Sequence, residues 1–109
     1  MGEEKQRLTG VWFIAEERHR QKAEKGFDDA HDDEHKWGEL AWAAACYAAP
    51  GEIAHKTKDA DFRPCYVDPW PWDRKWDKRD KHDYKRRLII AGAWIAAEID
   101  RLIRLEERD

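Results

Sequence analysis

The sequence lacks most of the features that mark common classes of functional site. It has only two cysteines, Cys46 and Cys65, without a CxxC pair or a secretory signal, which predicts free thiols in a reduced, cytoplasmic setting. No apolar run approaches the length of a transmembrane span, so we expect no membrane partner. A glycine-rich phosphate loop, a GxSxG elbow and a Cys-His-Asp set at a familiar spacing are also missing. A covalent nucleophile is therefore not indicated.

Charge is abundant, and so are aromatic residues. Charged residues make up 41% of the 109 residues, and the mean hydropathy is -1.05. Such values approach those of disordered chains, but the seven tryptophans argue for an ordered fold, because disordered segments are poor in aromatics. We therefore expect one helical domain over residues 1–109, with a small core of aromatic and alanine side chains.

The spacing of apolar residues predicts a helix over residues 3–25 and another over residues 83–107. The first carries its apolar stripe at Leu8, Val11, Trp12, Ala15 and, at the edge, His19, and we expect Gly26 to stop it. The second carries its stripe at Leu88, Gly92, Ile95, Ile99 and Leu102. Because a helix usually turns its apolar stripe to the core, both stripes are expected to pack inward, with Gly92 allowing close approach to alanines of the remaining helix.

That remaining helix is predicted over residues 33–48. Asp32 or Asp33 would cap its start, and Pro50-Gly51 would end it; its apolar line is Leu40, Ala43, Ala44 and Tyr47. Residues 51–82 show no strand-like alternation, and their prolines break regular structure. An irregular segment of this length needs anchors, and the candidates are Trp70, Trp72 and Trp76. The predicted fold class is all-α, with three main helices and a long Trp/Pro-rich irregular segment between the second and third.

Residues 31–40, HDDEHKWGEL, concentrate side chains that bind metals or protons. Residues three or four apart share a helix face, which groups His31 or Asp32 with His35 and Glu39. Glu98, at the flank of the 83–107 stripe, would complete a set drawn from different helices. Such a set predicts Mg²⁺ or Mn²⁺, held by His31, Asp32, His35, Glu39 and Glu98. The alternative is structural: the aspartates cap the helix, and the glutamates form ion pairs with arginines.

A basic segment, residues 73–87, is interleaved with aromatic residues and predicts phosphate binding. We expect a single nucleotide, with Trp72 or Trp76 stacked on the base and Lys85, Arg86 or Arg87 at the phosphates. The aspartates within this segment and the acidic stretch at residues 28–35 argue against duplex DNA as a ligand.

Several stretches resemble a family of small phage and prophage proteins. The HDDxHxxGELA pattern of residues 31–41 is the most specific, and Trp70-Pro71-Trp72 matches the family as well. This resemblance implies a phage or prophage origin rather than a reaction. A second resemblance is to the all-α nucleotide pyrophosphohydrolases of the MazG type, which hold Mg²⁺ with ExxE and ExxD acids. Glu39 in GELAxAA and Glu98 are similar to those acids, whereas Lys36, Trp42 and Arg101 stand where their partners would be.

These patterns lead to two functional hypotheses. The first is a phage-type, metal-dependent nucleotide-binding protein, in its catalytic form a pyrophosphohydrolase with Glu39 and Glu98 as catalytic residues. The alternative is a non-enzymatic phage or prophage protein that binds a host factor or sequesters a nucleotide signal, in an anti-defence or regulatory role. The sequence leaves this choice open. Because so thin a bundle leaves apolar faces uncovered, we also expect a homodimer.

Overall fold

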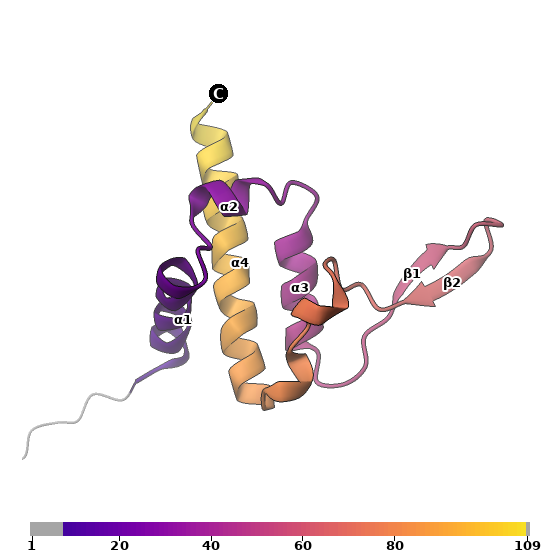
Figure 1. Cartoon of the computed structure of the whole chain (residues 1–109), viewed down its shortest axis with the longest axis horizontal. Helices are drawn as coiled ribbons and strands as arrows, with labels where there is room; N and C mark the ends of the chain where they lie inside the picture. The colour runs from indigo at the N-terminus through magenta and orange to yellow at the C-terminus, as the bar shows by residue number, and fades with distance from the viewer. Residues whose placement is uncertain (1–7, 109) are drawn as a thin grey trace, which may run out of the picture.

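The computed structural model describes residues 8–108 and is mostly helical, as the sequence predicts. The elements follow in the order α1 (Gly10–Glu24), α2 (Asp29–Asp33), α3 (Glu39–Ala48), β1 (His55–Lys58), β2 (Pro64–Val67), the 3₁₀ turns η1 (Arg74–Trp76) and η2 (Arg79–Lys81), and α4 (Tyr84–Glu107). Figure 1 shows α3 beside α4, α1 on the other flank, and the β1–β2 hairpin projecting from the body.

Helix α4 is the central element, because α1, α2 and α3 all pack against it. It begins and ends close to the predicted residues, with Asp83 as its N-cap: the Asp83 carboxylate accepts a hydrogen bond from the backbone N–H of Arg86 at 2.8 Å. Near its C-terminal end, Arg104 and Arg108 donate to Asp33 of α2 at 2.8 and 2.9 Å. These ion pairs attach α2 to α4 and fix the position of the 28–35 segment.

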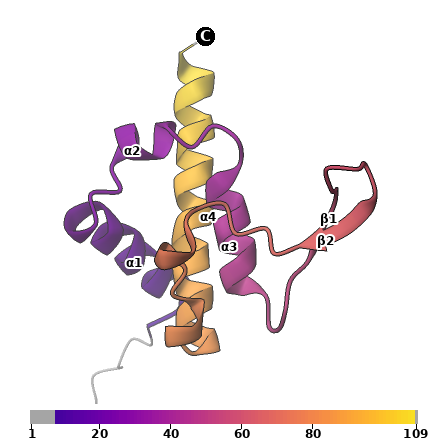
Figure 2. The ribbon, with the colours of Figure 1, turned by 45° about the vertical axis from the view of Figure 1, so that its right-hand side comes forward.

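The core lies between α3 and α4 and has the expected aromatic and alanine composition. The predicted apolar line of α3 is buried, and it packs on the α4 side chains Ile90, Ala91, Trp94 and Ala97. Trp70 and Trp72 cover this cluster from one side, where residues 69–82 cross in front of the helices (Figure 2). Trp76 is 61% exposed, so the expectation that all three tryptophans anchor the segment is wrong for Trp76.

The helix predicted over residues 33–48 is in fact two helices with a turn between them. α2 is capped by Asp28, whose carboxylate accepts from the N–H of His31, and α3 starts only at Glu39. Gly38 precedes α3 with φ of 81°, a left-handed conformation that interrupts a helical path and suits glycine. Neither Asp32 nor Asp33 is therefore an N-cap of the alanine-rich helix.

The segment predicted to be irregular contains an antiparallel hairpin. β1 pairs with β2 from His55 opposite Val67 to Lys58 opposite Pro64. The Asp59 carboxylate closes the turn by accepting hydrogen bonds from the N–H groups of Asp61 and Arg63, at 2.9 and 3.0 Å. Both strands are mostly exposed on both faces, so the alternation by which strands are recognised in a sequence is missing.

Candidate functional site

Helix α1 buries its polar side and exposes its apolar side. Glu17, at 2% exposure, is buried together with Arg18 and Gln21. The predicted stripe is instead exposed at all five positions, with Val11 at 79%: Leu8, Val11, Trp12, Ala15 and His19. The expected orientation is therefore wrong. The physical reason is that Glu17 and Arg18 have charged partners on other elements, Arg86 of α4 and the buried Asp32 of α2, and this rotation of the helix brings them together.

The predicted stripe of α4 also lies on the surface. Leu88, Ile95, Ile99 and Leu102 are all exposed, with Ile99 at 51%. The side that meets α3 consists largely of alanines and Trp94, which allow the alanine-rich α3 to approach closely. Gly92 does serve close packing, but against α1: a Cβ atom built there would lie 2.5 Å from Cδ1 of Ile14. The expected approach to the alanines of α3 is thus corrected.

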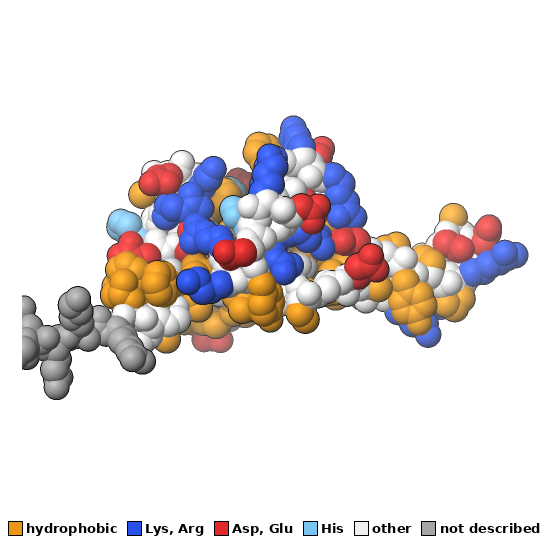
Figure 3. All heavy atoms as spheres, turned by 90° about the horizontal axis from the view of Figure 1, so that it is seen from below, with side chains coloured by type: hydrophobic (Ala, Val, Ile, Leu, Met, Phe, Trp, Pro, Cys, Tyr) orange, Lys and Arg blue, Asp and Glu red, His pale blue; other side chains and the backbone are white. Residues whose placement is uncertain are grey.

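Together the exposed stripes form one uncovered apolar surface. We define the apolar face as the exposed large hydrophobic residues of α1 and the outer side of α4: Leu8, Val11, Trp12, Leu88, Ile95, Ile99, Leu102 and Ile103. Figure 3 shows hydrophobic side chains gathered along one side of the molecule, from the α1 side toward the hairpin. Contiguous apolar surface of this kind marks interaction sites in soluble proteins, because leaving it in water is unfavourable.

Asp32, the first predicted metal ligand, is part of a buried ion pair. Arg18 donates from Nη2 to Oδ2 of Asp32 at 2.7 Å, and the Asp32 side chain is 1% exposed. Nη1 of Arg18 donates to the carbonyl oxygen of Phe27 at 3.2 Å, which holds the chain between α1 and α2. Nδ1 of His31 lies 3.3 Å from the other Asp32 oxygen. Asp32 thus has a structural role in joining α1 to α2.

His35 and Glu39 are brought together as predicted, with 3.3 Å between His35 Nδ1 and Glu39 Oε2. Glu39 also accepts a hydrogen bond from the backbone N–H of Trp37 at 2.7 Å. The rings of His31 and His35 meet edge to face, with their centroids 4.9 Å apart. Glu98 is paired with Arg101 on the same helix. Among residues 8–108 no three or more His, Cys, Asp or Glu side chains are grouped so that they could hold a metal ion.

Each of the predicted nucleotide-binding residues contacts a different part of the protein. Trp72 is packed in the core against Trp70 and Trp94, whereas Trp76 is exposed, with Nζ of Lys75 5.2 Å from its ring centroid. Arg87 donates to the carbonyl oxygen of Ala49 at 3.1 Å. Nζ of Lys85 lies 6.0 Å from the ring centroid of Phe13, and Arg86 pairs with Glu17. These contacts leave the five residues on different parts of the surface and core.

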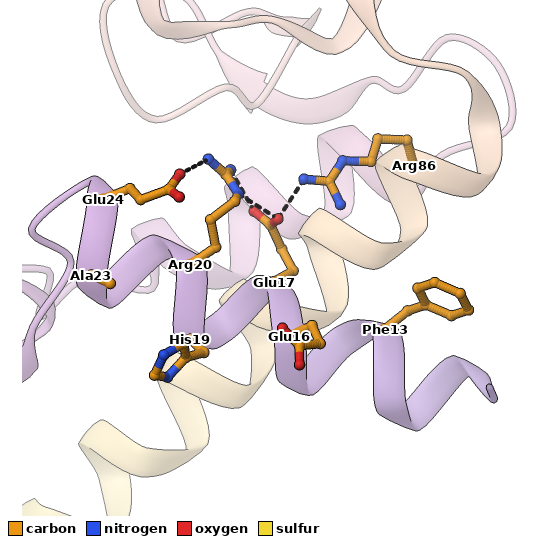
Figure 4. Close-up of a pocket in the computed structure, with 8 residues that line it drawn as sticks. All are labelled: Phe13, Glu16, Glu17, His19, Arg20, Ala23, Glu24 and Arg86. Atoms are coloured by element: carbon orange, nitrogen blue, oxygen red, sulfur yellow. Dashed lines mark hydrogen bonds and ion pairs between the residues drawn. The ribbon is translucent and has the colours of Figure 1, made fainter.

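Glu17 lies at a hollow of about 460 Å³ beside α1, shown in Figure 4. Its carboxylate lies between the guanidinium groups of Arg20 and Arg86. Burial raises the pKa of Glu17, but the hydrogen bonds from Arg20 and Arg86 outweigh it and hold this pKa below the usual range. Glu16 and Glu24 also line the hollow, so its three carboxylates outnumber its two guanidinium groups and it offers no surplus positive charge to a phosphate.

A second hollow, of about 780 Å³, lies at the base of the hairpin and was not predicted. Three of its charged groups are paired with one another: Arg79 contacts Asp68 at 3.0 Å and Asp77 at 2.9 Å. The Cys46 thiol is buried nearby, with its Sγ 3.7 Å from Oδ1 of Asp68. Burial raises the pKa of Cys46 to about 11, so its thiol is poorly suited to act as a nucleophile.

Comparisons with known proteins add no relative to this picture: no protein-family model, curated protein or solved structure matches the chain. The resemblances to phage proteins and to MazG-type enzymes therefore stay predictions. Within residues 8–108 no helix has both the length and the apolar character needed to cross a bilayer. The apolar face is consequently the feature from which a function can be argued.

Proposed function

We propose that this protein is a non-catalytic helical protein that acts by binding another protein chain through its apolar face. The observation that carries the proposal is that α4 directs a stripe of large apolar side chains to solvent, to which Leu8 and the α1 residues Val11 and Trp12 add. A helix that is apolar on several sides is normally covered on all of them. α3 and α1 cover two sides of α4. The third side, with Ile95 and Ile99, stays exposed and is available to bind a partner.

The charged groups support the same proposal. Asp32, Glu98 and Glu17 each have an arginine partner, and a carboxylate in such a pair must give up that partner before it can bind a cation. The Glu17–Arg86 pair holds α1 on α4 and the Asp32–Arg18 pair joins α2 to α1, which fixes the direction of the apolar face. We infer that these paired acids support the fold and that the apolar face supports the function.

Photocrosslinking in the cells that make the protein tests this proposal. Benzoylphenylalanine in place of Ile99 lies on the apolar face, whereas in place of Trp37, which is 87% exposed, it lies outside the face. We expect a discrete protein adduct from position 99 and a much weaker one from position 37. No adduct at position 99, or equal adducts at both, would contradict the proposal.

Metal-dependent nucleotide binding, the other function that the sequence predicts, would have a different signature. It requires heat on titration with Mg²⁺ or Mn²⁺ and a nucleoside triphosphate, and hydrolysis that Glu39→Gln abolishes while the fold is retained. Such turnover would overturn the non-catalytic proposal. We expect neither signal, because the candidate acids are already paired with His35 or with arginines.

A further inference from the structure

We infer that the α4 part of the apolar face binds the same surface of a second copy of this chain, with the two α4 helices antiparallel. This pairing rests on the proposed function, because it names the partner of the same face. It accounts for three independent features of the molecule: the spacing of the exposed residues, the charges at the two ends of the stripe, and the position of α1 beside it.

The spacing of the exposed residues is that of a helix–helix seam. Leu88, Gly92, Ile95, Ile99 and Leu102 follow one another by four, three, four and three residues, the heptad repeat of two helices packed side by side. Gly92 is half-buried beside Ile14 of α1, and the other four are exposed. An α-helix of 24 residues is about 36 Å long. This is long enough for a seam of three heptads. Leucine and isoleucine are the residues that such seams prefer, and here they are exposed along the whole stripe.

The charges at the two ends specify the direction. Lys85 continues the stripe three residues before Leu88, and Glu106 continues it four residues after Leu102; both are exposed. A basic residue at the N-terminal end of a helix and an acidic one at its C-terminal end both oppose the helix macrodipole. In an antiparallel pair, Lys85 of each copy meets the end of the other copy that carries Glu106. A parallel pair would place lysine beside lysine and glutamate beside glutamate.

Helix α1 borders the seam and enlarges it. Ile14 packs on Gly92, so α1 crosses α4 beside the middle of the stripe. Val11 and Trp12 of α1 are exposed, and Figure 3 shows hydrophobic side chains along one side of the molecule that includes the α1 side, so we infer that the second copy can pack against α1 as well.

Sedimentation of the purified full-length chain tests the pairing. We expect a reversible dimer between 1 and 200 µM, on the order of the micromolar affinities of small interfaces. Ile95→Lys with Ile99→Lys should raise the dimer dissociation constant at least about 100-fold while the melting temperature at high dilution is unchanged. The matched control is Phe62→Lys, an equal change at a hairpin position that is 80% exposed; it should leave the dissociation constant unaltered.

Charge reversal tests the direction. Lys85→Glu alone and Glu106→Lys alone should each weaken the antiparallel dimer by about tenfold, because like charges then meet at both ends. The double variant Lys85→Glu/Glu106→Lys should restore the original affinity. In a parallel dimer all three variants would have the same dissociation constant, and this result would overturn the antiparallel arrangement.

The two proposals fail in distinguishable ways. If the purified chain is monomeric at 200 µM while position 99 crosslinks to a different protein, the self-pairing is overturned and the proposed function is supported. If the chain is monomeric and position 99 gives no adduct, both are overturned. A crosslinked adduct of twice the chain's mass, with a dimer in sedimentation, supports both.

Discussion

α3 is ten residues long and apolar around most of its circumference, whereas α4 has 24 residues and two apolar sides that point in opposite directions. The fold buries the line of α3 completely, whereas on α4 it buries the side toward α3, with Ala91, Trp94 and Ala97, and residues toward α1, and leaves the Ile95–Ile99 side exposed. Small residues beside one large ring allow α3 and α4 to approach closely. Ile95 and Ile99 lie on the side of α4 that neither α3 nor α1 covers, and they stay available to a partner. Ile90 of the same helix is buried, so burial inside the chain follows where α1 and α3 lie on α4, rather than apolar character alone.

The largest expected effect on stability distinguishes the buried apolar line of α3 from the exposed apolar side of α4. Leu40→Ala, in the buried line of α3, should lower the free energy of unfolding by about 3 kcal/mol, because it leaves a cavity. Ile99→Ala should lower it by less than about 0.5 kcal/mol in a dilute, monomeric sample. Urea unfolding at two protein concentrations measures both, and the effect of Ile99→Ala should grow with concentration. If both variants lowered the free energy of unfolding equally in dilute solution, Ile99 would be as important to the folded monomer as the buried Leu40, which would contradict this comparison.

A second prediction concerns the polar side of α1. The folded-state pKa of Glu17 lies below the ordinary value of 4.5. Its contribution to stability is therefore complete above the unfolded pKa and is lost as the pH falls through the folded value. Glu17→Gln should cost about 2 kcal/mol at pH 7, since it removes charged hydrogen bonds to Arg20 and Arg86.

Urea unfolding at pH 7 and at pH 3 measures this effect. The difference between the wild-type protein and Glu17→Gln should shrink at the lower pH, because below the ordinary pKa of 4.5 the unfolded chain takes up the proton and the stability that the charge supplies begins to be lost. Glu16→Gln is the matched control, because Glu16 is an exposed neighbour with the same side chain. A difference that is as large at pH 3 as at pH 7 would show that the Glu17 charge does not support this side of α1.

The smallest expected effect tests how α1 lies on α4. Gly92→Ala should destabilise the protein by about 1 kcal/mol, as overpacking against Ile14 exceeds the gain in helix propensity. In an Ile14→Ala background the same change should become stabilising, because the clash is removed and the propensity gain remains. Thermal unfolding of the four proteins in this double-mutant cycle measures the coupling. Additive effects would mean that α1 does not cross α4 at Gly92.

Much of the fold could be predicted from local signals. Asp83 as the start of α4, the left-handed Gly26 after α1 and the Pro50-Gly51 pair after α3 are all determined by a few neighbouring residues. The hairpin could not be predicted, because its strands have four residues each and are held by the Asp59 turn rather than by a buried face. In the candidate site, the His35–Glu39 pair was predicted by helical spacing, although His35 lies outside any helix.

By itself, the sequence determined most of the helical segments and where they stop, since these properties depend on neighbours along the chain. It did not determine the break at Gly38, which makes two helices of the predicted 33–48 helix, or the start of α1 at Gly10 within the predicted 3–25 helix. Only the tertiary structure decided which side of each helix faces inward. Leu8 and Val11 are exposed because Arg18 must reach Asp32 and Glu17 must reach Arg86. A buried charge without its partner costs several kcal/mol, more than an exposed leucine or valine does. The partners are distant in the sequence, so the orientation that exposes the apolar face depends on contacts that no local pattern reveals.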